Sequence, residues 1–79
     1  MKIWKSISEL DTDQVLDVVG EKVPFKKKQV ASIFFIDLEP DANWAHKCTY
    51  LAIVTKGDGE PEAVSWEWPP QDMWCWKEL

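Results

Sequence analysis

Two segments of this chain carry apolar side chains at both odd and even positions, and they constrain its fold more than any other feature. In the segment 29–38 an extended backbone would place Val30, Phe34, Ile36 and Leu38 on one face and Ala31, Ile33 and Phe35 on the other. In the segment 49–55 it would place Leu51 and Ile53 opposite Tyr50, Ala52 and Val54. Strands that are apolar on both faces are typical of the centre of a sheet. We therefore predict two central strands.

Three further segments have weaker strand patterns. Residues 63–68 follow a Gly57-Asp58-Gly59 turn and alternate cleanly, which predicts a strand with one wet face that ends at Pro69-Pro70. Residues 2–7 alternate weakly and predict a short first strand. The tail 71–79 is read as an edge strand or as an extended segment packed on the sheet.

The segment 11–19 is the one candidate for a helix. Its apolar residues recur at spacings that lie along one helical face, Asp11 offers an N-cap, and Gly20 stands where a left-handed C-cap would follow. The alternative is a hairpin of 15–19 and 22–25, which the valines favour. The resulting expectation is an α+β fold, with one short N-terminal helix packed on a three- to four-stranded antiparallel meander sheet.

Length and charge limit the classes of function. Seventy-nine residues suit one domain, residues 1–79, and a 46% hydrophobic content indicates that it folds. The net charge is −5 and the chain has no arginine, which argues against a nucleic-acid partner. The basic cluster Lys26–Lys28, with Lys22 nearby, is interpreted as a solvated surface.

The cysteines and the apolar runs bear on location. Cys48 and Cys75 are too few for a disulfide framework, and polar residues follow Met1 without the apolar run of a secretory signal. No apolar stretch reaches the length of about 18 residues that a membrane span requires. We expect a cytoplasmic protein with free thiols and no membrane partner.

Six tryptophans are the most distinctive feature of the composition. Two pairs have i, i+2 spacing, so in extended chain each pair would project from one face, and exposed indoles are frequent anchors in binding sites. The opposite interpretation is that a small domain uses indoles to build its core. The residues we predict to bind are Trp44, His46, Trp66, Trp68, Trp74 and Trp76.

The segment 37–48 is long for a hairpin loop and rich in functional groups. Asp37, Glu39, Asp41 and Asn43 have the spacing that opens a calcium loop, but Ala42 stands where that loop needs glycine. His46 and Cys48 are two residues apart, which raises a thiol–imidazole pair, yet the sequence contains no oxyanion or four-ligand motif. We expect no catalytic residue, metal or cofactor.

These patterns favour a protein-binding domain of the inhibitor, immunity or adaptor type. Its indoles would anchor a larger partner, and its acidic groups would attract a basic surface. An acidic helix face with Asp11, Asp13 and Asp17 is a candidate for the polar rim of the binding interface. The first alternative is a small-ligand binder that stacks a sugar or a heterocycle on paired tryptophans, and the second is a Cys/His enzyme or metal site in 37–48. Self-association is open as well.

Overall fold

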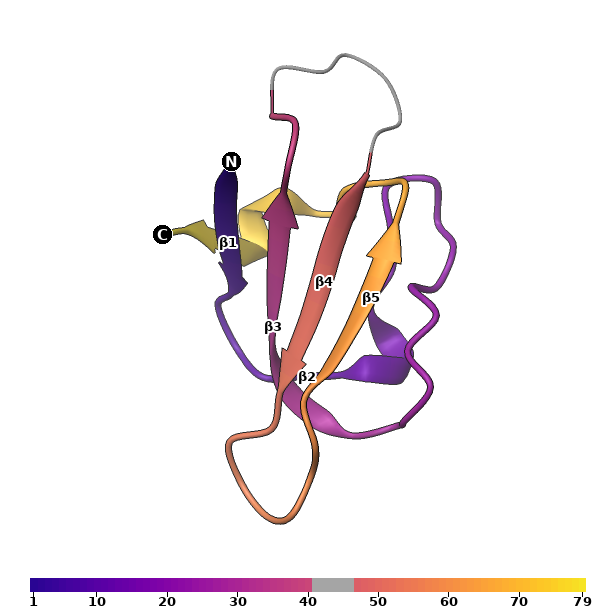
Figure 1. The fold of residues 1–79 in the computed structure, drawn as a ribbon, viewed down its shortest axis with the longest axis vertical. Coiled ribbons are helices and arrows are strands. Elements are labelled where there is room, and N and C mark those ends of the chain that lie inside the picture. The colour runs from indigo at the N-terminus through magenta and orange to yellow at the C-terminus, as the bar shows by residue number, and fades with distance from the viewer. Residues whose placement is uncertain (41–46) are drawn as a thin grey trace.

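The computed structural model describes residues 1–40 and 47–79. These residues form a six-stranded antiparallel sheet in the order β5-β4-β3-β1-β6, with the short β2 attached to β3 (Figure 1). The elements in chain order are β1 (Lys2–Ser6), β2 (Leu10–Asp11), the 3₁₀ turn η1 (Thr12–Gln14), β3 (Val30–Asp37), β4 (Cys48–Ile53), β5 (Glu62–Trp66), the 3₁₀ turn η2 (Met73–Cys75) and β6 (Trp76–Glu78).

The two segments with apolar residues on both faces are the neighbouring strands β3 and β4 of this sheet. Phe35 pairs with Tyr50 and Phe34 with Leu51, so side chains of the same face lie opposite one another. The strand predictions for 29–38 and 49–55 are therefore confirmed, with ends that differ by one or two residues. The strand predicted at 63–68 is also found, as β5, but it ends at Trp66.

The two ends of the described chain meet in the same sheet. β1 lies between β3 and β6, so that Trp4 pairs with Phe35 on one side and with Glu78 on the other. The amide of Leu79 extends the ladder by donating to the carbonyl of Ile3 at 2.8 Å. The predicted first strand at 2–7 is confirmed as β1, and the tail contributes the edge strand β6.

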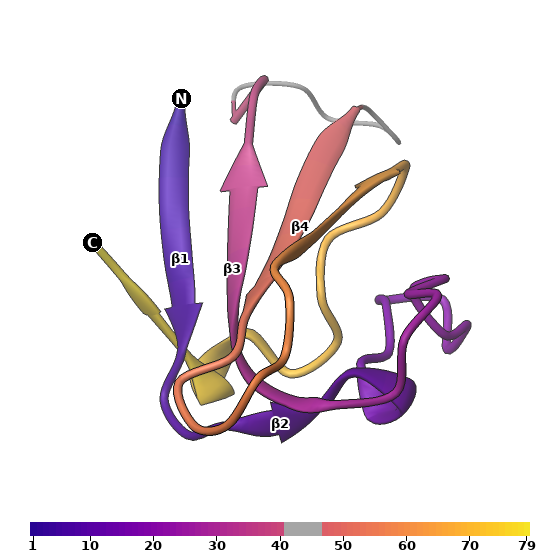
Figure 2. The ribbon, with the colours of Figure 1, turned by 60° about the horizontal axis from the view of Figure 1, so that its bottom comes forward.

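The core lies on one side of the sheet. Figure 2 shows β2, η1 and the chain that follows them gathered to that side of β1, β3 and β4. The largest buried rings are Phe35 and Tyr50, whose centroids are 5.3 Å apart. The other buried apolar residues are Val15, Val23, Ala31, Ile33, Cys48, Ala52, Val64 and Trp76.

The predicted α+β class is wrong, because the described residues contain 3₁₀ turns and no α-helix. The sheet is also larger than the predicted three- to four-stranded meander, since β1 pairs with β3 and with β6. Within the described ranges, no helical segment has the length and hydropathy needed to cross a membrane.

The segment 11–19 forms turns rather than a helix because its polar side chains find backbone partners outside a helical ladder. The Thr12 hydroxyl donates to the carbonyl of Lys27 at 2.6 Å and accepts from the amide of Gln29 at 3.0 Å. From Val15 onward the chain is extended and reverses, with the amide of Val23 donating to the carbonyl of Val15 at 2.9 Å. This geometry is close to the hairpin alternative, which β-branched valines favour.

Candidate functional site

A buried aspartate organises the reversed chain between Val15 and Val23. Asp17 is fully buried, and its Oδ1 accepts hydrogen bonds from the amides of Val19 at 3.0 Å and Glu21 at 2.9 Å. Its Oδ2 accepts from the indole Nε1 of Trp66 at 2.7 Å. Because a buried carboxylate is costly without donors, these three bonds fix the turn against the end of β5.

The prediction that Asp17 belongs to an exposed acidic helix face is wrong. Its helix is absent and its side chain has no exposed area, whereas Asp13 is exposed. The sequence does contain a signal for this turn, because Asp17 is followed three residues later by Gly20 with φ of 91°. Aspartate side chains commonly accept from the backbone amides that follow them, so the Asp17–Gly20 spacing could have predicted such a turn.

A second polar cluster lies where β4 meets the chain after β5. The Tyr50 hydroxyl donates to the carbonyl of Trp68 at 2.8 Å, and Cys48 Sγ lies 3.3 Å from the carbonyl of Trp66 and 3.4 Å from that of Trp68. Burial raises the pKa of the Cys48 thiol to about 12, with smaller contributions from Asp37 and Asp17. Burial also raises the pKa of Tyr50 above its ordinary value. Both groups are therefore protonated hydrogen-bond donors at neutral pH.

The tryptophans predicted to bind occupy different environments. Trp66 packs against the core and donates to Asp17, and Trp76 is itself a core residue with 7% of its area exposed. Trp68 is half-buried beyond the end of β5. Trp74 is 78% exposed. Trp44 and His46, which were also predicted to bind, lie outside the described residues.

The i, i+2 pairs do not pave one sheet face. Trp74 belongs to the 3₁₀ turn η2, whereas Trp76 begins β6 and faces the core, so an extended backbone does not connect them. Trp66 ends β5, and a bend at Glu67 and Trp68 follows it. The assumption of extended chain failed at both pairs because the chain turns there.

A pocket of about 180 Å³ lies between the tail and the segment that follows β2. The residues that line it are Leu10, Gln14, Val15, Leu16, Gln71, Asp72, Cys75 and Trp76. Trp74 stands in the turn between the lining residues Asp72 and Cys75, and the carbonyl of Cys75 accepts from the amide of Ile7 at 2.9 Å. Ile7 is 69% exposed. Trp74 and Ile7 thus adjoin lining residues through the backbone, although neither side chain lines the pocket itself.

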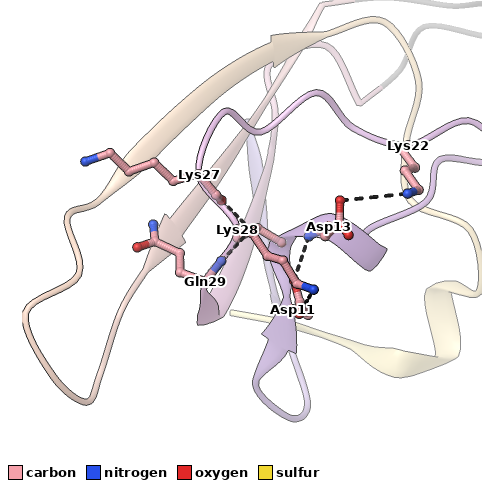
Figure 3. Close-up of polar contacts among 7 residues, drawn as sticks. Asp11, Asp13, Lys22, Lys27, Lys28 and Gln29 are labelled. Atoms are coloured by element: carbon pink, nitrogen blue, oxygen red, sulfur yellow. Dashed lines mark hydrogen bonds and ion pairs between the residues drawn. The ribbon is translucent and has the colours of Figure 1, made fainter.

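Three lysines of the basic cluster, Lys22, Lys27 and Lys28, pair with carboxylates. Lys22 Nζ lies 3.8 Å from Asp13 and Lys28 Nζ lies 4.0 Å from Asp11 (Figure 3). Lys27 Nζ donates to Glu60 at 2.8 Å, and this bond raises the pKa of Lys27 and lowers that of Glu60. Such a balanced surface agrees with the solvated interpretation and gives no support to a phosphate site.

The enzyme and metal alternatives rested on the segment 37–48, of which Asp41 and His46 lie outside the described residues. Among the described residues, no three His, Cys, Asp or Glu side chains are grouped closely enough to hold a metal ion. Cys48 is a buried thiol rather than a thiolate at neutral pH, so its surroundings among the described residues do not support a nucleophilic role.

Comparison with known proteins gives no family to which the chain can be assigned. It matches no protein-family model, and no curated protein or solved structure matches it.

Proposed function

We propose that this domain works by binding a protein partner, as inhibitors, immunity proteins and adaptors do. The observation that carries this proposal is the 78% exposure of Trp74, in a domain where Trp66 and Trp76 are used for packing. Tryptophan leaves a large apolar area in water when it is exposed, and it is enriched among the residues that dominate binding energies. Trp74 is therefore our proposed anchor.

The pocket beside this turn supports a protein partner over a small ligand. Its volume of about 180 Å³ falls below the roughly 300–1,000 Å³ typical of small-molecule sites. It is large enough for one side chain of a partner, which would sit beside the turn that carries Trp74. The stacking alternative needs paired indoles on one face, and the Trp74–Trp76 pair does not provide them.

Charge and thiol chemistry extend the proposal. A net charge of −5 would speed association with a partner that presents a basic surface. Asp72, which lines the pocket, would face that surface at the anchor.

Cys48 and Cys75 are both free thiols, which is consistent with a reducing compartment, and we propose that the protein is cytoplasmic.

The test is affinity capture from the source organism and its competitors or hosts with three forms of the protein. Wild type is compared with Trp74→Ala and with Leu38→Ala, a matched exposed apolar residue. Leu38 is exposed and adjoins the Lys2–Asp37 pair at the start of β1. Trp74 precedes Cys75, which bonds to Ile7 beyond the end of β1, so the two substituted residues lie near opposite ends of that strand. We expect a stoichiometric partner that Leu38→Ala retains, that Trp74→Ala loses and that added salt weakens.

Two results would overturn the proposal. Equal capture by wild type and Trp74→Ala would remove Trp74 as the anchor. The absence of any captured protein with wild type would remove the protein-binding function itself, because a complex that buries at least about 1,000 Å² should survive a brief wash.

A further inference from the structure

The second apolar face of β3 and β4 lies opposite the core. Ile33 and Tyr50 on the inner face are completely buried, whereas Phe34 and Leu51 on the outer face are only half-buried. The outer side chains belong neither to the core nor to the residues packed against it. Strands that are apolar on both faces are usually covered on both. Here the described chain covers the inner face and leaves the outer face uncovered.

The register joins these side chains into one surface. Ile3 lies opposite Ile36, and Phe34 opposite Leu51, so the apolar residues of three neighbouring strands are in contact range. Figure 1 views this side, and no described segment crosses in front of β1, β3 or β4. We call this surface the outer sheet face and define it by Ile3, Lys5, Phe34, Ile36, Leu51, Ile53 and Lys77.

The charged residues of the outer sheet face are both cationic. Lys5 pairs with Phe34 on β3 and with Lys77 on β6, so all three side chains project from this face. Lys5 Nζ lies 5.8 Å from the centroid of the Phe34 ring. Among the residues that the described strands direct to this side, the one acidic residue is Asp11, which pairs with Val30 at the start of β3 and lies 4.0 Å from Lys28 Nζ. A chain with a net charge of −5 therefore presents one apolar face bordered by lysines.

This distribution of charge favours an acidic partner over a second copy of the chain. In face-to-face packing of two copies, the one carboxylate that the described strands offer to Lys5 and Lys77 would be that of Asp11, which already lies 4.0 Å from Lys28 Nζ. Both copies also carry the same net charge. Apolar residues flanked by aspartate or glutamate would instead bury the face and pair with its lysines.

The size of the face matches one helix. Its residues come from four neighbouring strands about 4.8 Å apart and form three rows about 7 Å apart, which gives a surface roughly 14 Å in each direction. A helix of three to four turns is about 16–22 Å long and about 10 Å across, so it would span the face. We propose that the outer sheet face docks an amphipathic helix of a partner protein, with its apolar stripe on Phe34 and Leu51 and its acidic flanks toward Lys5 and Lys77. The site is separate from Trp74 and does not depend on it.

The experiment uses two synthetic helical peptides with the same leucine stripe, one flanked by glutamate and the other by lysine. Each is titrated into the full ¹⁵N-labelled chain while amide shifts are followed by NMR. We expect the glutamate peptide to bind at least about tenfold more tightly, with shifts on β1, β3 and β4. Leu51→Lys should weaken binding by at least about tenfold, and the double variant Lys5→Glu/Lys77→Glu should reverse the preference between peptides.

The control variant is Val18→Lys, which changes an exposed apolar residue of the 15–23 turn and should leave binding unchanged. Native-like amide dispersion confirms that each variant folds. Equal affinity for the two peptides, no binding of the glutamate peptide, or shifts centred on η2 would overturn the proposal. A dimer of the free protein that Leu51→Lys dissociates would assign the face to a second copy and would overturn it as well.

Discussion

The indole Nε1 of Trp66 donates to Asp17 Oδ2 at 2.7 Å, across a separation of 49 residues. This bond ties the end of β5 to the turn that the other oxygen of Asp17 holds together. It gives Trp66 a structural role and shows why an aspartate can be completely buried here.

Asp17→Asn should destabilise the fold although it preserves the shape of the side chain. Asparagine has one acceptor oxygen, so its amide group would face either the indole or the two backbone donors that the carboxylate now accepts from. Leaving a buried donor unpaired costs about 1–3 kcal/mol, measurable by urea unfolding. The matched control Asp13→Asn, at an exposed pair with Lys22, should change stability by less than about 0.5 kcal/mol. An Asp17→Asn protein as stable as wild type would contradict this account.

The two cysteines should react at different rates in the native protein. Cys75 is exposed, whereas Cys48 is buried and burial raises its pKa to about 12, so thiolate is scarce at Cys48. DTNB should therefore modify one thiol rapidly and the second only after unfolding in urea. Cys75→Ser should remove the rapid phase. A rapid phase that persists in this variant would show that Cys48 is accessible.

The buried thiol should also make stability depend on pH in alkaline solution. The pKa of Cys48 is raised from 9.0 to about 12 on folding, so above pH 9 the unfolded chain loses the thiol proton that the folded chain retains. The contribution of Cys48 to the free energy of unfolding is thus fully present below pH 9, and it falls as pH rises toward the folded pKa, by up to about 1.4 kcal/mol per pH unit. Urea unfolding between pH 8 and 10 should give a shallower decline for Cys48→Ala than for wild type. Cys75→Ala is the control, and an unchanged slope in Cys48→Ala would refute the assignment.

Gly59 occupies a position where a methyl group has no room. A Cβ atom built there would lie 2.5 Å from Val54 Cγ2 and 2.8 Å from Gln29 Oε1. Gly59→Ala should therefore cost about 1–3 kcal/mol through steric overlap. Val54→Ala removes the methyl groups that collide, so the double variant should lose less stability than the sum of the single variants. Additive losses would show that Val54 is not the source of the strain.

The sequence predicted the strands better than it predicted the turns. β3 and β4 were recognisable because their apolar residues fill both faces over several positions, and no helical spacing explains that pattern. The helix expected at 11–19 failed because Thr12 and Asp17 bond to backbone groups near and far along the chain. Those partners are set by tertiary contacts, which local spacing does not encode.

The candidate site was predictable only in part. Trp74 was singled out by composition, but its exposure follows from η2, a 3₁₀ turn that breaks the alternation with Trp76. The pocket beside it joins Leu10 and Leu16 to Cys75, and nothing in the sequence indicates that these segments are neighbours. The outer sheet face was present in the pattern, since β3 and β4 were apolar on both sides. The pattern did not predict that the described chain would leave that face uncovered.

The pairing of Trp4 with Glu78 has a consequence for the order in which the molecule folds. β3, β4 and β5 are neighbours both in the chain and in the sheet, so their contacts join segments close in sequence and can form early. β1 and β6 can pair only after nearly the whole described chain has been brought together, which costs more loop-closure entropy. During synthesis on a ribosome, one edge of β1 would stay unpaired until β6 had been synthesised. Completion of the sheet is therefore the slow step that we expect to limit the appearance of native protein.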